Sequence, residues 1–232
     1  SHAVGARYAG RPVGCGEFAA MTVFSFHPVK IITSAEGGMV LTNRPELADR
    51  LRRLRSHGMT RDPQQMSEAS HGPWYYQQVE LGFNYRMTDL QAALGLSQLK
   101  KLDGFVQRRQ YLAARYQQLL QDLPLTLPKA QADAQSAWHL YVVRLQLDGL
   151  QRSHRQVFEG LREAGIGVNL HYIPVHLQPY YQALGFAQGD FPEAEHYYAE
   201  AISLPIYPGL SDSEQDYVVQ QVRRWIQEPS IS

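Results

Sequence analysis

The second half of the sequence alternates β-rich runs with helical patterns, and this order is the strongest constraint on the fold. The segments follow one another along the chain as the run HLYVVRLQL at 139–147, a helical pattern from Ser153 to Gly165, the run VNLHYIPV at 168–175, and helical patterns at 191–202 and 213–226. Strands that alternate with helices are typical of α/β layers. We therefore expect an α/β fold, with a small α/β domain over residues 104–232.

The first part of the sequence predicts two strands that flank a loop containing Lys30. Residues 19–26 (AAMTVFSF) and 39–43 (MVLTN) are short β-rich runs, and the loop between them ends at a Gly-Gly turn. Helical patterns follow from Pro45 onward and, after a capping box, from Thr88 onward. Lys30 is thus expected in a connection between two neighbouring strands.

Two segments lack a periodic pattern. Residues 59–80 are polar and contain two prolines and an aromatic cluster, which predicts a long functional or interface loop. The segment around Pro124 and Pro128 is interpreted as a linker between two lobes.

Composition excludes several classes of function. The 22 Lys and Arg residues balance 22 Asp and Glu residues, so no broad basic face is expected for nucleic acid. The single cysteine, Cys15, excludes an internal disulfide and a cysteine-based zinc site, and it fits a reducing cytoplasm. No apolar run has the length needed to span a membrane. The nine histidines lack the spacing of a metal site, so no metal is expected.

The loop around Lys30 carries the densest chemical signal. A lysine amine in a polar but partly desolvated pocket is nucleophilic enough to bond an aldehyde cofactor. The hydroxyl of Ser25, at a strand end, is placed to bond a cofactor phosphate, and Gly37 and Gly38 allow a sharp turn. Taken alone, however, a loop lysine is more often a solvated surface charge, and Gly-Gly is usually only a turn.

Three segments together indicate a family. SFHPVKIITSAEGG (25–38) resembles the Ser-Phe-His/Tyr-x-x-Lys…Glu-Gly-Gly signature of the DegT/DnrJ/EryC1/StrS sugar aminotransferases. GFNYRMTDLQAALGLSQL (82–99) is similar to their second signature, and SHAVGA (1–6) resembles a further family segment. The resemblance implies the C-terminal part of a fold-type I aminotransferase that depends on pyridoxal phosphate (PLP). Residues 1–103 would then be the C-terminal part of the large PLP-binding domain.

The resemblance also implies roles for four residues. Lys30 would carry PLP as a Schiff base, and Ser25 would bond its phosphate. His2, where most family members have Gln, would bond the phenolic oxygen of the cofactor, unless it is a terminal residue with no fixed role. Asn84 would reach across a homodimer to the PLP phosphate of the other subunit. The family aspartate that pairs with the pyridine nitrogen would precede residue 1, so we expect a fragment of a longer chain.

Substrate contacts are expected in the smaller domain. The resemblance places a nucleotide-sugar near four consecutive residues, namely Asn169, Leu170, His171 and Tyr172. The alternative for each is ordinary strand packing, and this alternative is strongest for Leu170.

The resulting prediction is a transaminase that moves an amino group from glutamate to a UDP-linked 4-keto-6-deoxy-N-acetylhexosamine. One alternative is a sugar-nucleotide dehydratase on the same fold, in which His replaces the lysine, so Lys30 argues against it. A second alternative is a non-catalytic dimerising module. A Ser25–His27 hydrolase is disfavoured because the Gly-x-Ser-x-Gly motif is missing.

Overall fold

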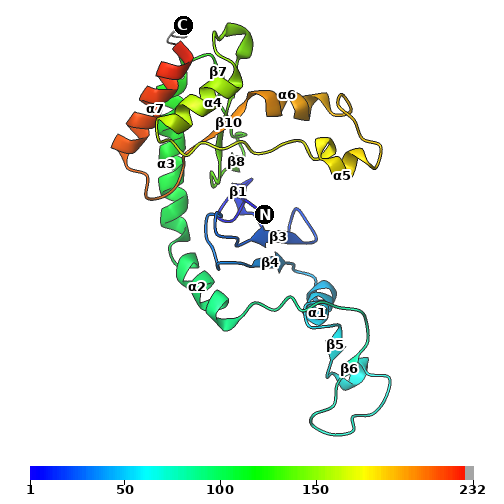
Figure 1. The fold of residues 1–232 in the computed structure, drawn as a ribbon. Helices are drawn as coiled ribbons and strands as arrows, with labels where there is room; N and C mark the ends of the chain where they lie inside the picture. The colour runs from blue at the N-terminus through cyan, green and yellow to red at the C-terminus, as the bar shows by residue number, and fades with distance from the viewer. Residues whose placement is uncertain (228–232) are drawn as a thin grey trace. The chain divides into compact units, whose positions relative to one another are not determined.

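The computed structural model describes residues 1–227, and the chain divides into two compact units, residues 1–103 and 104 onward (Figure 1). The first unit contains β1 (Arg7–Tyr8), β2 (Arg11–Pro12), β3 (Thr22–Ser25), β4 (Gly38–Leu41), α1 (Pro45–Leu54), β5 (Met59–Thr60), η1 (Pro63–Gln65), β6 (Gln77–Gln78) and α2 (Asp89–Leu99). Helix α3 (Leu102–Leu120) begins at the boundary. The second unit continues with β7 (Leu125–Thr126), β8 (Ala134–Gln135), β9 (Tyr141–Leu145), η2 (Leu147–Gly149), α4 (His154–Glu163), η3 (Val175–Leu177), α5 (Pro179–Gln182), α6 (Pro192–Glu200), β10 (Ala201–Leu204) and α7 (Asp212–Gln227).

The predicted strand pair around Lys30 is confirmed. Strands β3 and β4 pair antiparallel with Thr22 opposite Leu41 and Ser25 opposite Gly38. The two predicted helices after them also form: α1 has Pro45 in its first turn, where a missing N–H is harmless. At α2, the Thr88 hydroxyl accepts from the backbone N–H of Gln91, which completes the expected capping box.

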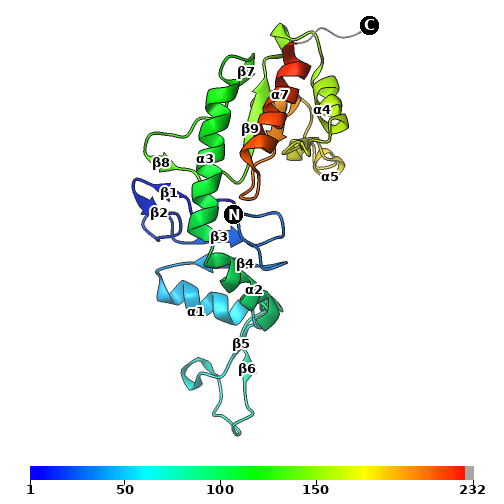
Figure 2. The same ribbon diagram turned by 90° about the vertical axis from the view of Figure 1, so that its left-hand side faces the viewer.

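The segment 59–80 has more structure than its sequence predicts. Strands β5 and β6 form a short antiparallel hairpin, with Met59 opposite Gln78, and η1 lies between them (Figure 2). Strands of two residues are too short to show a period-2 pattern, so no sequence signal for them exists. The long connection expected here is therefore a hairpin with an irregular tip.

An antiparallel sheet with strand order β10-β9-β7 forms the centre of the second unit. Along β9, Tyr141, Val143 and Leu145 are buried while the residues between them are partly exposed. This alternation directs one face of the strand into the core. Every residue of β10 is buried, so this short strand lies inside the unit.

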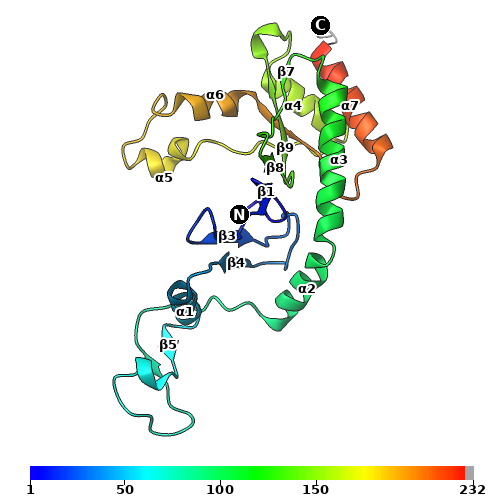
Figure 3. The ribbon, with the colours of Figure 1, turned by 180° about the vertical axis from the view of Figure 1, so that it is seen from behind.

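Helices α3 and α7 run side by side in the same direction (Figure 3). The buried Gln215 side chain donates to the carbonyl of Leu112 at 2.8 Å. Near the other end, Arg223 makes a two-pronged ion pair with Asp122. Together with the α4 face, these helices enclose the largely apolar core of the second unit.

Two expectations for the second half are wrong, and one expected helix is present but slightly shorter. The run 168–175 forms only an isolated bridge between Asn169 and Ser203, because Pro174 lacks a donor and η3 begins at Val175. The helix expected at 191–202 ends at Glu200, and the buried residues that follow form β10. The segment 124–128 is not a linker, since it contains β7, which pairs with β9.

The contact between α4 and α7 depends on a glycine. A Cβ added at Gly160 would overlap the indole ring of Trp225. We expect Gly160→Ala to destabilise the chain by about 1–3 kcal/mol, because overpacking forces neighbouring side chains out of place. Chemical unfolding followed by circular dichroism measures this effect.

Gly104 provides the matched control, since it also lies in a helix but a Cβ added there would meet no atom within 4 Å. We expect Gly104→Ala to be neutral or to stabilise by about 0.5–1 kcal/mol. Equal effects from the two substitutions would contradict the packing argument.

Candidate active site

Lys30 lies in the loop between β3 and β4 and meets the imidazole of His2. The Lys30 Nζ and His2 Nε2 atoms are 2.6 Å apart, a hydrogen-bond distance. The lysine side chain is half-buried, as expected for an amine in a partly desolvated pocket. The structure thus brings together two of the residues that the sequence nominated.

The second half of the lysine loop is anchored in the core of the first unit. Ile31 and Ile32 are buried, and Ser34 is fully buried, with its hydroxyl donating to the carbonyl of Glu36 at 2.9 Å. A Cβ at Gly37 would overlap the Ser34 hydroxyl, so only glycine fits at this position. The expected role of Gly37 as a tight turn residue therefore has a steric basis.

Ser25 is the last residue of β3 and is joined to the lysine loop through His27. The His27 N–H is 3.5 Å from Ser25 Oγ, a long contact, and the His27 carbonyl accepts from the Lys30 N–H at 2.9 Å. His27 Nδ1 also lies 2.8 Å from a carboxylate oxygen of Glu36. Sequence reasoning assigned no role to this His27–Glu36 pair.

These side chains fit the chemical demands of PLP. Lys30 in the loop offers an amine for the aldehyde, Ser25 at the end of β3 offers a hydroxyl for the phosphate, and His2 offers an imidazole beside the amine. Gly38 adds a restriction, since its Cβ would lie 2.9 Å from the carbonyl oxygen of Phe24. These polar groups, and the lack of a side chain at Gly38, are both compatible with a pyridine ring bound next to the ends of β3 and β4.

Asn84 lies in the same unit, on the segment between β6 and α2. Its backbone forms an isolated bridge with Ser56, and its side chain is exposed. An exposed amide is available to a second subunit, and the predicted role across a dimer stays a prediction.

The four predicted substrate residues lie at the edge of the sheet in the second unit. Asn169 exchanges backbone hydrogen bonds with Ser203 of β10, and His171 Nδ1 lies 2.8 Å from the Ser203 hydroxyl. The Leu170 N–H donates to the Asn169 side chain. Tyr172 is 62% exposed, with its ring edge against His171. His171 is therefore held by β10, whereas the Tyr172 side chain is largely exposed.

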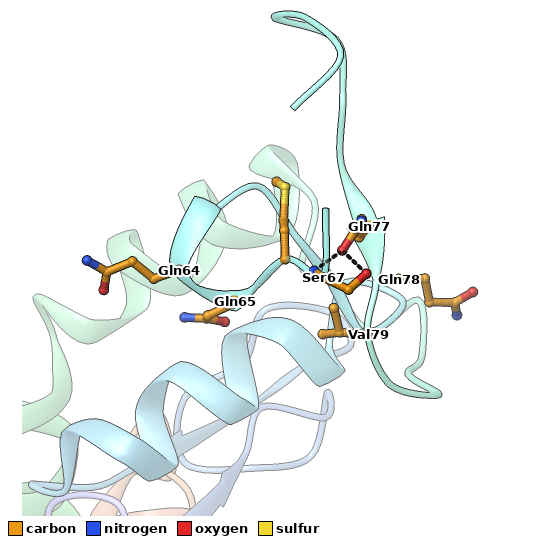
Figure 4. Close-up of a pocket in the computed structure, with 7 residues that line it drawn as sticks. Gln64, Gln65, Ser67, Gln77, Gln78 and Val79 are labelled. Carbon is orange, nitrogen blue, oxygen red and sulfur yellow. Dashed lines mark hydrogen bonds between the residues drawn. The ribbon is translucent and has the colours of Figure 1, made fainter. Parts of the chain in front are cut away.

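A polar pocket of about 550 Å³ lies on the β5–β6 hairpin (Figure 4). Amide side chains such as Gln64 and Gln78 line it, and the Gln77 side chain accepts from both the N–H and the hydroxyl of Ser67. None of the predicted site residues lines this pocket. Its hydrogen bonds stabilise the tip of the hairpin, and we assign it no ligand.

Residues 1–227 contain neither a metal-binding cluster nor a membrane-spanning helix. Within that range, no three His, Cys, Asp or Glu side chains gather as a metal ion would require. In the same residues, no helix is both long and apolar enough to cross a membrane.

Known proteins resemble this chain over nearly its whole length. The DegT/DnrJ/EryC1/StrS aminotransferase family matches residues 1–223. The spore coat polysaccharide biosynthesis protein SpsC of Bacillus subtilis is 41% identical over 226 residues, which are 96% of this chain and 57% of SpsC. The chain thus spans a little over half the length of the curated relatives it matches.

Solved structures agree with this match. PseC of Helicobacter pylori, an aminotransferase involved in the biosynthesis of pseudoaminic acid, has a TM-score of 0.87 and 33% identity, covering 98% of this chain and 58% of PseC. The putative sugar aminotransferase Spr1654 of Streptococcus pneumoniae, in its PMP form, has a TM-score of 0.85 and 32% identity. The match covers 95% of this chain and 56% of the Spr1654 chain.

The fold is that of a fold-type I, PLP-dependent aminotransferase. PLP is the cofactor of this class, and Spr1654 has been solved in PLP and PMP forms. The chain belongs to the DegT/DnrJ/EryC1/StrS aminotransferase family.

Proposed function

We propose that this chain is part of an enzyme that transfers an amino group from glutamate to C4 of a UDP-linked 4-keto-6-deoxy-N-acetylhexosamine. The product is UDP-4-amino-4,6-dideoxy-N-acetyl-β-L-altrosamine. One observation carries the proposal: the amine of Lys30, in the β3–β4 loop, lies at hydrogen-bond distance from the imidazole of His2. The likeness to PseC, an aminotransferase of pseudoaminic acid biosynthesis, supports this choice of sugar.

The proposal gives Lys30, Ser25 and His2 distinct roles around the cofactor. PLP, when bound, supplies an aldehyde and a ring that withdraws electrons from the reacting carbon. The Lys30 amine would hold the cofactor through its aldehyde and would carry a proton between two carbons during the amino transfer. Ser25 would donate its hydroxyl to the phosphate. His2 contacts the Lys30 amine and would also bond the phenolic oxygen of the cofactor.

The proposal extends to assembly and location. Residues 1–103 belong to the large PLP-binding domain and residues from 104 onward to the small one. Two copies form a homodimer in which Asn84 of each copy bonds the phosphate in the other, and the enzyme acts in the cytoplasm.

The test uses the longest natural reading frame that contains these 232 residues. The protein is incubated with PLP, glutamate and the UDP-linked 4-ketosugar, and products are identified by mass spectrometry. We expect 2-oxoglutarate and an amino sugar nucleotide in equal amounts. A product that has lost oxygen without gaining nitrogen would indicate a dehydratase instead, and no product with any ketosugar would favour a non-catalytic module.

A second measurement tests the sugar site alone. We expect Tyr172→Phe to raise KM for the sugar nucleotide by about threefold to tenfold, because one hydrogen bond to an uncharged group contributes about 0.5–1.5 kcal/mol. The half-reaction with glutamate, followed by absorbance in a single turnover, should not change.

Tyr180→Phe is the matched control, since Tyr180 is a similarly exposed tyrosine in α5, outside the four predicted residues. An equal rise in KM for both variants would remove Tyr172 from the sugar site. A change in the glutamate half-reaction would place Tyr172 at the cofactor instead.

A further inference from the structure

The first half of the lysine loop projects from the protein with little support of its own. Residues 27–30 form a turn in which the Lys30 N–H donates to the His27 carbonyl at 2.9 Å, and Pro28 occupies the position that proline favours. Val29, at its tip, is 65% exposed. The buried anchors, Ile31 and Ile32, lie after the lysine, so they fix only one side of it.

The other side is held by a hydrogen bond between the side chains of His27 and Glu36. Their side-chain atoms Nδ1 and Oε1 are 2.8 Å apart. Because a carboxylate only accepts hydrogen bonds, the His27 ring donates from Nδ1. This contact joins the start of the loop, shortly after β3, to its end, shortly before β4.

The register of the hairpin explains why these two residues meet. Strands β3 and β4 end with Ser25 opposite Gly38, and the next step is present as a 2.8 Å hydrogen bond from the Phe26 N–H to the Gly37 carbonyl. One further step places His27 opposite Glu36. Side chains directly opposite in an antiparallel pair are within reach of each other.

His27 therefore connects the residues that we assign to the cofactor. Its N–H faces the Ser25 hydroxyl, its carbonyl holds the Lys30 N–H, and its ring is fixed by Glu36. If the backbone of His27 rotated, the Lys30 amine would move relative to the hydroxyl of Ser25.

We infer that His27 and Glu36 are positioning residues that fix the Lys30 amine for its bond to the cofactor aldehyde. The inference rests on the proposed function of Lys30. Neither side chain takes part in bond making. They act by holding the turn 27–30 in one orientation, which matters because small displacements of a reacting group slow a reaction strongly.

The experiment measures how fast Lys30 bonds PLP. Protein and saturating PLP are mixed, samples are reduced with borohydride at intervals, and the labelled Lys30 peptide is quantified by mass spectrometry. His27→Leu and His27→Asn form a matched pair, since both side chains branch at Cγ but only Asn keeps a donor near the Nδ1 position. Glu36→Ala removes the acceptor, and the double variant His27→Leu with Glu36→Ala removes both.

We expect His27→Leu and Glu36→Ala each to slow labelling by about tenfold, with unchanged thermal midpoints. The double variant should be no slower than either single variant, and His27→Asn should recover most of the rate. As a control, Glu159→Ala breaks the exposed Arg155–Glu159 pair on α4 and should label at the wild-type rate.

Two results would overturn the inference: labelling of both single variants within about twofold of wild type, or effects that multiply in the double variant. Slow labelling that His27→Asn does not restore would also overturn it, because the donor would then not matter. If the wild-type chain itself fails to label Lys30, the proposed function falls first, and this outcome differs from normal labelling in every variant.

Discussion

Replacing Lys30 with alanine is expected to abolish covalent attachment of PLP and to lower turnover by at least about a thousandfold, because the variant has neither the nucleophile nor the proton carrier. The near-visible absorbance of lysine-bound PLP should vanish, and borohydride should leave no label on the peptide containing position 30. The substitution removes the 2.6 Å contact with His2, but the loop should keep its fold because Ile31, Ile32 and Ser34 remain buried.

A second variant separates the loss of the amine from the loss of its positive charge, and a third serves as a control. Lys30→Arg keeps a cation beside His2 but cannot bond an aldehyde, so it should be as inactive as Lys30→Ala. Lys101→Ala removes an exposed lysine just after α2 and should behave as wild type. Turnover that survives in Lys30→Ala, or label that appears on another lysine, would show that Lys30 is not the residue that carries PLP.

The sequence predicted those elements whose signals are local. The strand pair β3–β4 follows from two β-rich runs around a Gly-Gly turn. Helix α2 follows from the capping box at Thr88, and α4 follows from the cap residue Ser153. Each of these signals lies within a few residues of the element it specifies. These elements can therefore be predicted without knowledge of the rest of the fold.

Elements that depend on distant partners were missed. The run at 168–175 has strand-forming residues, yet only Asn169 finds a partner, Ser203, thirty-four residues later. The buried strand β10 directly follows α6 and looked like its continuation. Tertiary contacts with β9 decide its conformation, and local propensity does not report them.

The candidate site shows the same division. Lys30 and Ser25 were nominated from a motif, but the motif alone did not reveal that His27 and Glu36 pair across the loop. The signal was present in the hairpin register, since strand ends at Ser25 and Gly38 imply that His27 and Glu36 are opposite. A register deduced from the two strands would have been sufficient to find the pair.

The proposed role of Asn84 has a consequence for mixed dimers. If Asn84 serves the site of the other copy, Lys30→Ala and Asn84→Ala subunits form a hybrid dimer with one complete site. Helix α2, just after Asn84, exposes its leucines Leu90, Leu94, Leu96 and Leu99 in this part of the protein. Apolar residues on several sides of a helix are typical of a helix that is buried in the assembled protein.

Mixing the two inactive variants in equal amounts, with subunit exchange, should therefore restore about a quarter of wild-type turnover, since half of the dimers are hybrids and each has one working site. Each variant alone should stay inactive. Hybrids made from Lys30→Ala and His2→Ala subunits provide the control: His2 contacts Lys30 within its own chain, so no complete site forms and no activity returns. Failure of the Asn84 mixture to recover activity, despite proven exchange of subunits, would place Asn84 in the site of its own chain.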